Sequence, residues 1–354
     1  MKIAVGLSGG VDSTVAAVLL REAGHDIIGV TMKLWRKGRF LGGERDACFG
    51  PGEEEDIDRA ADFAKALDIP YHVFDCSEEY EKAIIGYFRD ASLKGLTPNP
   101  CVMCNAAMKF GLLPRMARKS GLDFDKFATG HYAQIVSAEG GRLAVRRADD
   151  TKKDQSYFLY RLSQDQLAET LFPLGTLTKI EVRGIAADRG LAAAEKLDSQ
   201  DFYSGDRDEL IGAEEREGEI VDLSGKVLGR HNGFWHYTVG QRKGIGVFGP
   251  EPHYVIRLDA CHNRVVVGSR QEAFTKTFRV KDMRWMGMAE TSSAIECRVK
   301  VRSTGEPLGP VVLENGTCNS DGEGIFGVAP GQSAVFYGEN GTILCGGVIS
   351  TQPA

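Results

Sequence analysis

The N-terminal half of the chain alternates short apolar runs with longer apolar or amphipathic ones. Residues 3–5 form an apolar run that stops at Ser8-Gly9-Gly10, and an apolar stretch of helical length begins at Thr14. Runs of the same two kinds predict three further strands and two further helices, at 25–32, 70–76, 127–133, 53–67 and 78–94. Strands that alternate with helices are typical of an α/β domain with a doubly wound parallel sheet.

The pattern changes after about residue 206, where the helical period fades. Short alternating runs such as 218–222 and 254–258 replace it, separated by Gly and Asn turns, and predict β structure. A chain of 354 residues is too long for one ordinary core. We therefore expect two or three domains, with the α/β domain first.

The glycine turn between the first strand and the first helix predicts a phosphate site. Gly9 and Gly10 allow backbone N–H groups to converge on an anion, Ser8 and Ser13 add hydroxyl groups, and the helix N-terminus adds positive partial charge. The turn has neither Gly-Lys-Ser/Thr nor Gly-x-Gly-x-x-Gly, which excludes a Walker loop and a dinucleotide-binding loop. Residues 8–13 instead resemble the PP-loop of the N-type ATP pyrophosphatases, which cleave ATP to AMP and pyrophosphate while adenylating an oxygen of a second substrate.

A second candidate site lies at Pro98, Pro100, Cys101 and Cys104. The prolines make the segment rigid and extended, and a helix is expected to follow toward residues 109–113. Both cysteines then lie at or just before a helix N-terminus, where the helix dipole lowers the pKa of a thiol. We expect nucleophilic or metal-binding chemistry here, and the plainer alternative is two ordinary cysteines in a turn. One pair alone does not make a tetrahedral zinc site.

Composition restricts the class of protein. Hydrophobic residues make up 42% of the chain, charged residues 26%, and the formal net charge is -6. No apolar run approaches the length of a membrane span, and eight cysteines favour a reducing compartment. We therefore expect a soluble, cytoplasmic protein with no membrane partner and no targeting segment ahead of the first strand.

The net negative charge excludes a chain that is basic throughout, but one segment is basic. Residues 276–302 hold seven basic side chains against three acidic ones. We define the basic strip by these seven residues: Lys276, Arg279, Lys281, Arg284, Arg298, Lys300 and Arg302. The strip favours contact with an RNA backbone, and the alternative is a set of ordinary solvated charges.

Further motifs resemble those of the tRNA-specific 2-thiouridylases, which install sulfur at C2 of the wobble uridine of certain tRNAs. In family order along nearly the whole chain, they lie at residues 6–13, 97–100, 104–105, 109–111, 128–133, 153–159, 172–175, 236–244 and 331–337. The resemblance implies three parts. These are a PP-loop catalytic domain over 1–205, a small and mostly β central domain over 206–275, and a C-terminal β-barrel that contacts tRNA over 276–354.

The resemblance also implies roles for single residues. Cys104 matches the nucleophile, and Asn99, Pro100 and Cys101 match the segment that meets the target base. ATP, with Mg²⁺ on its pyrophosphate, would bind at Gly6, Leu7, Ser8, Gly9, Gly10, Val11, Asp12, Ser13, Met32 and Gly130. Contacts with tRNA are implied for Asn99, Pro100, His131, Lys153, Asp154, Gln155 and Gln332, to which we add Arg302 from the basic strip. ATP would convert the C2 oxygen into an adenylate leaving group, and sulfur would displace AMP from a base splayed out of its loop.

Two positions depart from the family pattern. Cys101 stands where Asp is usual, and Tyr203, in the segment 198–203, stands where the family has a second catalytic cysteine. A phenol cannot carry or resolve a persulfide. Two mechanisms would work without that second cysteine. In one, Cys101 forms a disulfide with Cys104 in each cycle. In the other, Cys48, Cys101 and Cys104 hold an iron–sulfur cluster of the 4Fe–4S type, whose open iron binds sulfide.

The remaining cysteines are expected to be packing residues: Cys76, Cys261, Cys297, Cys318 and Cys345. Two other functions stay open. One alternative is another PP-loop adenylating enzyme, an amidotransferase-type synthetase for a small metabolite, although the C-terminal β half and Lys153-Asp154-Gln155 would then have no role. The chain also fits a protein that binds tRNA or carries sulfur without thiolating the base. The upstream sulfur donor, a persulfide relay or sulfide, is not named by the sequence.

Overall fold

The computed structural model describes residues 1–43, 47–191, 201–249 and 251–350. Its first part is a five-stranded parallel sheet in the order β4-β2-β1-β5-β8. The strands are β1 (Lys2–Gly6), β2 (Asp26–Lys33), β4 (Tyr71–Asp75), β5 (Lys126–Ala128) and β8 (Thr170–Leu171). The strands predicted at 3–5, 25–32 and 70–76 are confirmed, whereas the one predicted at 127–133 ends at Ala128 and a separate hairpin follows, β6 (Ala133–Ser137) with β7 (Leu143–Arg147).

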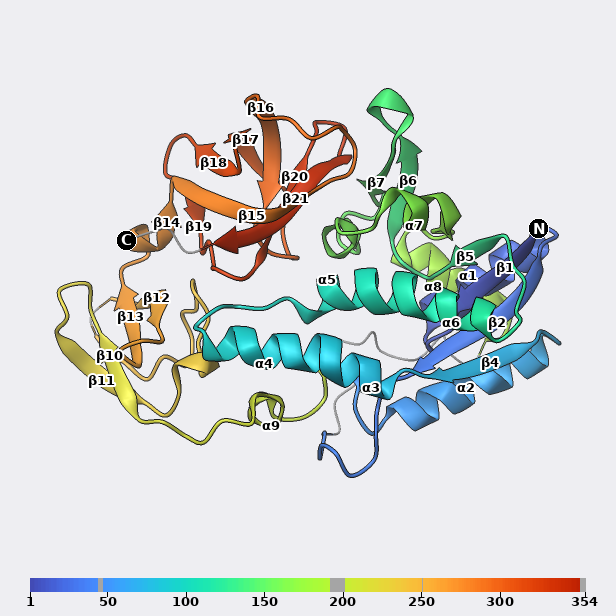
Figure 1. Cartoon of the computed structure of the whole chain (residues 1–354), viewed down its shortest axis with the longest axis horizontal. Helices are drawn as coiled ribbons and strands as arrows, with labels where there is room; N and C mark the ends of the chain where they lie inside the picture. The colour runs from blue at the N-terminus through green and yellow to red at the C-terminus, as the bar shows by residue number, and fades with distance from the viewer. Residues whose placement is uncertain (44–46, 192–200, 250, 351–354) are drawn as a thin grey trace.

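Helices cover both faces of this sheet, as a doubly wound arrangement requires (Figure 1). On one face, Val5 of β1 joins a buried cluster with α1 (Val11–Glu22) and α2 (Glu53–Ala66). The neighbouring Ala4 faces the other way and packs with the helical segment over residues 100–119. Side chains of a strand alternate between its two faces, so one short strand supplies both cores.

We call the helical segment over residues 100–119 the rod. It consists of α5 (Pro100–Cys104), η2 (Asn105–Leu112) with a wider π-helical turn, and α6 (Leu113–Lys119). Backbone angles stay helical at its junctions, so the three pieces are continuous. Further α- and π-helices in the described part of the chain are α3 (Ser77–Tyr80), η1 (Glu81–Ile85), α4 (Gly86–Leu93), α7 (Gln164–Glu169), α8 (Lys179–Asp188) and α9 (Arg207–Ile211). The helices predicted at 53–67 and 78–94 are therefore confirmed, the second as α3, η1 and α4.

The segment between β2 and α2 contains a short strand. β3 (Ala47–Phe49) pairs in parallel with β9 (Asp201–Tyr203), so that Phe49 lies opposite Tyr203. Three residues are too few to show an alternating period, and the partner strand comes from a distant part of the chain. The sequence pattern therefore gave no sign of this pairing.

The second and third parts of the molecule are β domains (Figure 1). A four-stranded sheet in the order β11-β10-β13-β12 is built from β10 (Gly218–Val221), β11 (Val227–His231), β12 (Tyr254–Asp259) and β13 (Arg264–Gly268). A closed barrel in the order β15-β18-β17-β16-β20-β21 follows. Its strands are β15 (Thr277–Trp285), β16 (Ile295–Lys300), β17 (Leu308–Glu314), β18 (Thr317–Ser320), β20 (Ser333–Tyr337) and β21 (Ile343–Ser350), and the pair β14 (Phe274–Thr275) and β19 (Ile325–Phe326) lies apart from this sheet. The expected fold class is confirmed.

The cysteines expected to pack do so with one exception. Cys297, Cys318 and Cys345 are buried in the core of the barrel, and Cys76 is buried near the rod. Cys261 is exposed because it lies in the turn between β12 and β13, so the expectation was wrong for this residue. Within the described ranges, every helix is too short or too polar to cross a bilayer.

The barrel packs on the N-terminal domain next to the rod. Tyr157 donates through its hydroxyl to the Ser333 carbonyl at 2.9 Å, and the Thr97 N–H donates to the Pro330 carbonyl at 2.7 Å. At Gly331, which has φ +93°, a Cβ would lie 2.8 Å from the Thr97 nitrogen. Glycine therefore allows the barrel to approach the segment that leads into the two cysteines.

Candidate nucleotide and thiol site

The turn between β1 and α1 has no room for a side chain at its centre. Gly9 has φ +69°, and a Cβ there would lie 2.4 Å from the carbonyl oxygen of Asp56 in α2. Only glycine combines a readily adopted positive φ with the absence of a Cβ atom. The Ser13 hydroxyl accepts from the Ser8 N–H at 3.1 Å and lies 3.2 Å from the Ser8 hydroxyl. Hydroxyl and backbone donors thus gather at the N-terminus of a 12-residue helix, an arrangement that fits the phosphates of ATP.

The end of β5 closes against the same turn. A Cβ at Gly130 would lie 2.6 Å from the Ser13 nitrogen and 2.6 Å from the Asp12 carbonyl carbon, so glycine is required there too. The Asp12 carboxylate accepts from Lys179 Nζ at 2.7 Å and from the Tyr132 hydroxyl at 2.8 Å. Sequence reasoning missed Lys179, because α8 brings it from 167 residues away and no local pattern links the two residues.

Met32 lies near the carboxyl end of β2, at the edge of the sheet that also carries the turn after β1. It is half-buried and packs against two cores, one beneath the rod and one around Cys104. Met32 therefore lies at the same edge of the sheet as the turn after β1, and its contact with the nucleotide stays a prediction. In the described part of the chain, no group of three or more His, Cys, Asp or Glu side chains is arranged to hold a metal ion. Mg²⁺ on ATP takes many of its ligands from phosphates and water.

Asn99 is the N-cap of the rod. Its Oδ1 accepts from the Val102 N–H at 3.2 Å, and Pro100 occupies the first helical turn. The helix expected after the prolines is confirmed. The Asn99 Nδ2 also donates to Gln332 Oε1 of the barrel at 3.3 Å, which joins the cysteine segment to the third domain.

Cys104 lies one turn inside the rod, and its thiol is buried. Burial raises the pKa of Cys104 to about 12, the Lys109 ammonium opposes this rise, and the charge of Cys48 adds to it. The expectation of a lowered thiol pKa is therefore wrong for Cys104, because lost hydration outweighs the helix terminus. Cys101 lies three residues earlier and is half-buried.

Cys48 is exposed on β3, and its Sγ donates to the Phe202 carbonyl at 3.5 Å. Charges on Cys48, Cys101 and Cys104 all raise the pKa of the buried Tyr80, after the larger effect of burial, so the three cysteines share one region. As described, however, they do not form a ligand group for a metal ion. The iron–sulfur cluster expected as one of the two alternatives therefore stays a prediction.

Tyr203, which replaces the family's second cysteine, is buried and holds a loop. Its ring contacts Trp35 and Phe49. Its hydroxyl donates to the Glu209 carboxylate and accepts from the Gly42 N–H at 3.3 Å. These contacts give Tyr203 a structural role in holding this loop. Positions 198–200 of the same segment lie outside the described residues.

His131 lies between the turn after β1 and the rod. Its Nδ1 is 2.8 Å from the Thr129 hydroxyl, and its ring contacts Phe110. Burial, and to a smaller extent the Lys109 ammonium, lower the pKa of His131 well below its usual range. Lys109 acts on both His131 and Cys104. The family motif at 109–111 contains Lys109, but the motif did not show that this residue links the two halves of the site.

Asp154 lies in the interior of the molecule. Its side chain has 0% exposure and pairs with Arg147 Nε at 3.2 Å and Lys300 Nζ at 3.7 Å. The Ser156 hydroxyl donates to it at 3.0 Å. Lys300 comes from the barrel, so these charges join the N-terminal domain to the barrel instead of facing a nucleic acid.

The other residues with implied tRNA contacts differ in exposure. Lys153 and Gln155 are half-buried, and the Gln155 side chain accepts from the Tyr132 N–H at 2.9 Å. Arg302 is exposed and lies 5.8 Å from the ring centre of Phe326. Five more residues of the basic strip are exposed: Lys276, Arg279, Lys281, Arg284 and Arg298.

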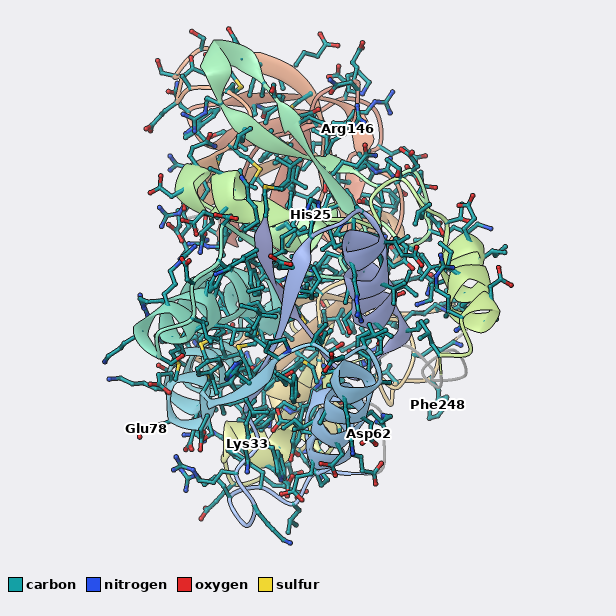
Figure 2. The ribbon with its side chains drawn as sticks, turned by 90° about the vertical axis from the view of Figure 1, so that its right-hand side faces the viewer. His25, Lys33, Asp62, Glu78, Arg146 and Phe248 are labelled. Carbon is teal, nitrogen blue, oxygen red and sulfur yellow. The ribbon has the colours of Figure 1, made fainter. Side chains whose placement is uncertain are left out.

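A hollow of about 590 Å³ is lined by residues of the central domain. Arg242, Ile245 and Phe248 are among the residues that line it. Phe248 is 98% exposed and projects from the ribbon (Figure 2). The sequence shows that Phe248 lies in a glycine-rich segment, but no sequence pattern shows that its side chain is exposed.

A parallel sheet with a glycine and hydroxyl turn after its first strand defines a nucleotide-binding domain of the PP-loop class, here joined to two β domains. Protein-family models match residues 1–203 ("tRNA methyl transferase HUP domain"), 210–269 ("tRNA methyl transferase PRC-barrel domain") and 275–349 ("Aminomethyltransferase beta-barrel domain"). The exact domain bounds expected above stay a prediction.

Curated relatives extend the match to the full length. Proteins named tRNA-specific 2-thiouridylase MnmA from Endomicrobium trichonymphae and Gloeothece citriformis are each 44% identical to the chain. The first match covers 99% of this chain and 99% of the relative, and the second covers 98% and 99%. The chain belongs to the tRNA-specific 2-thiouridylase family, as its motifs implied.

Solved structures show weaker similarity. A 4-thiouridine synthetase in complex with RNA and bound ATP has 17% identity and a TM-score of 0.37, over 59% of this chain and 45% of that one. NMN synthetase from Francisella tularensis has 16% identity and a TM-score of 0.34, over 58% and 71%. The fold assignment rests on the sheet topology and the family models.

Proposed function

We propose that this protein catalyses ATP-dependent 2-thiolation of the wobble uridine of tRNA. The observation that carries the proposal is the combination, in a member of this family, of a phosphate-binding turn with a capped helix that presents Cys101 and Cys104. Lys109 and His131 lie between these two parts. Contacts with tRNA are proposed at Asn99, Pro100, His131, Lys153, Gln155, Arg302 and Gln332.

The first chemical step activates the base. The uracil O2 attacks the α-phosphorus of ATP, pyrophosphate leaves, N3 loses its proton, and the C2 oxygen becomes part of a neutral adenylate. The proton returns to N3 when the thiolated base is released. The turn over residues 6–13, with Gly130 and Met32 beside it, binds and orients the nucleotide. Mg²⁺ on the departing pyrophosphate would offset its charge.

The second step transfers sulfur. The outer sulfur of a Cys104 persulfide attacks C2, AMP leaves, and the base is joined to Cys104 through two sulfurs. The Cys101 thiolate then attacks Cys104 Sγ, which releases 2-thiouridine and leaves a Cys101–Cys104 disulfide that a thiol must reduce. Residues three apart in a helix have Cα atoms about 5 Å apart, within the range for a disulfide. The persulfide sulfur comes from a protein persulfide, or from sulfide that attacks the Cys101–Cys104 disulfide at Cys104 Sγ and releases the Cys101 thiolate.

The test is an anaerobic reaction with ATP, a persulfide donor, a thiol reductant and unmodified transcript tRNA. We expect pyrophosphate release that needs both ATP and tRNA, with 2-thiouridine detected by mass spectrometry. Cys101→Ser and Cys104→Ser should abolish product, and Cys261→Ser is the matched control. Pyrophosphate release without tRNA would indicate a metabolite synthetase, and tRNA binding without any release would indicate a carrier.

Iron analysis of the same preparations distinguishes the disulfide route from the iron–sulfur cluster. An iron-free enzyme that remains fully active supports the disulfide route. Activity that follows iron content, and is lost in Cys48→Ser as well, would replace that route with an iron–sulfur cluster.

A further inference from the structure

Asn105, the residue after Cys104, has a buried acceptor without a donor. The side chain is 4% exposed, and its Nδ2 donates to the Phe158 carbonyl at 3.2 Å. Its Oδ1 has no hydrogen-bond partner within the described part of the chain. A buried carbonyl oxygen left without a donor is costly and uncommon in folded proteins. A donor from outside the protein would remove that cost.

The contact with Phe158 fixes which way the carboxamide points. A backbone carbonyl only accepts, so the Nδ2 group must face Phe158 and the Oδ1 must face the other way. Phe158 belongs to the short helical turn η4 (Ser156–Leu159), which lies against the rod. The carboxamide cannot turn over without losing this bond. Asn105 therefore offers a fixed acceptor, and only a donor on a ligand satisfies it.

Asn105 also marks a change in the rod. The π-helical turn η2 begins at this residue, and Gln166 Nε2 donates to the carbonyls of Ala106 at 2.9 Å and Phe110 at 3.0 Å inside it. Wider helical turns of this kind are frequent at functional sites. Lys109, which acts electrostatically on Cys104 and His131, lies in the same turn.

We propose that Asn105 Oδ1 accepts a hydrogen bond from N3–H of the target uracil and so selects uracil over cytosine. This inference rests on the proposed function. The N3–H of uracil is its one ring donor beside the reacting C2, whereas N3 of cytosine is an acceptor. An acceptor held opposite N3 attracts the first base and repels the second, and a site built to hydrogen-bond a substrate group discriminates strongly against an analogue that lacks it.

The test measures equilibrium binding, without ATP, of three tRNAs that carry uridine, N3-methyluridine or 5-methyluridine at the wobble position. Binding is the readout because adenylation at O2 requires the N3 proton to leave, and N3-methyluridine has no such proton whatever residue stands at position 105. The wild-type enzyme should bind the uridine and 5-methyluridine tRNAs with similar Kd and the N3-methyluridine tRNA at least about 10-fold more weakly. Asn105→Ala should bind the uridine tRNA about 10-fold more weakly than the wild-type enzyme does. It should also bind the uridine and N3-methyluridine tRNAs alike, because the shortened side chain neither bonds N3–H nor blocks the methyl group.

Asn263→Gly is the matched control. Asn263 also has a buried Oδ1 without a hydrogen-bond partner among the described residues, but it lies in the central domain, and its φ of +52° suits glycine. This variant should keep the wild-type preference for uridine over N3-methyluridine. Circular dichroism checks the fold of both variants.

If Asn105→Ala weakens binding of the uridine and N3-methyluridine tRNAs equally and keeps the ratio of their Kd values, a buried water meets the Oδ1 and the inference is wrong. If Asn105→Ala does not fold, the wild-type enzyme still decides, because equal binding of the N3-methyluridine and 5-methyluridine tRNAs would overturn the inference. If the wild-type enzyme binds the uridine tRNA but releases no pyrophosphate with it and ATP, the proposed function itself fails.

Discussion

Burial changes the acidity of two side chains beside the predicted site. Cys104 is held as a thiol inside an apolar cluster. Glu53, the first residue of α2, is 7% exposed and accepts from the N–H groups of Leu34 at 2.8 Å and Trp35 at 2.7 Å. Burial raises the pKa of Glu53 to about 7, although the two backbone donors favour the charged form. In both cases loss of hydration is the larger effect.

We expect Cys104 of the ligand-free protein to react slowly with iodoacetamide at neutral pH. With a pKa of about 12, few of its thiols are ionised at pH 7, and the rate should still rise about tenfold per pH unit up to pH 10. Residue-resolved mass spectrometry measures the rate, with the exposed Cys261 as an internal reference. A plateau for Cys104 below pH 9 would show that its thiol is more acidic than the structure indicates.

Glu53 should make stability depend on pH. Its folded pKa lies above the unfolded value, so it binds a proton more tightly in the folded state, and this stabilisation is full below about pH 4.5 and lost as pH rises through about 7. Glu53→Gln should remove a pH-dependent part of the unfolding free energy of roughly 3 kcal/mol at most. Urea unfolding of both proteins at pH 5 and pH 8 measures the difference. Equal pH dependence in the two proteins would contradict the prediction.

At the scale of single elements, close backbone approaches decide the shape of the nucleotide site. β1, α1, α2 and the end of β5 meet at one turn, and two glycines, Gly9 and Gly130, leave room for this meeting. The turn that begins α1 could be recognised from sequence because its residues are adjacent. The approach of α2 and β5 could not, because those residues are far along the chain.

Gly130→Ala should disrupt the nucleotide site. The new Cβ would overlap the backbone at Asp12 and Ser13, so we expect a loss of roughly 1–3 kcal/mol in stability and at least about tenfold weaker ATP binding. Calorimetric titration with ATP and thermal unfolding measure both effects. Gly184→Ala in α8, where nothing lies within 4 Å, should raise stability by roughly 0.5–1 kcal/mol and leave ATP binding unchanged. Unchanged ATP binding in Gly130→Ala would place the nucleotide elsewhere.

At the scale of the whole molecule, a buried group of charges joins the first domain to the barrel. Asp154 receives Arg147 from its own domain and Lys300 from β16. Arg147 also pairs with Glu306 of the barrel at 2.6 Å. Burial lowers the pKa of Lys300, and Asp154 opposes that shift. The position of the barrel against the cysteine segment depends on this group and on the Asn99–Gln332 contact.

Asp154→Asn should loosen the contact between the domain and the barrel. It leaves the buried Lys300 and the half-buried Arg147 with less compensation. Removal of one member of a buried ion pair costs roughly 3–5 kcal/mol. Thermal unfolding and limited proteolysis between residues 270 and 276 measure the effect. The double variant Asp154→Asn with Lys300→Met should recover part of the loss. Single and double variants of equal stability would show that Lys300 is not coupled to Asp154.

Local chemistry made much of this protein predictable. The alternation of apolar runs predicted the doubly wound sheet, and adjacent residues carried the glycine turn and the two cysteines at a helix start. The helix start also carried a wrong prediction, the low pKa of Cys104, because the sequence showed the terminus but not the burial around the thiol. Burial also opposes the tRNA contact implied for Asp154. The residue lies in a polar stretch of the sequence, but its carboxylate is enclosed in the folded protein.

The sequence by itself determined the class of sheet, the phosphate turn and the family, because each depends on residues that are neighbours along the chain. Tertiary structure alone decided which partners those residues meet. It paired Asp12 with Lys179, β3 with β9 and Asp154 with Lys300, and it left the Asn105 acceptor without a donor. Burial shifts pKa values, and distant contacts decide which buried polar atoms have a hydrogen-bond partner. Both burial and distant contacts arise only when remote segments of the chain pack together.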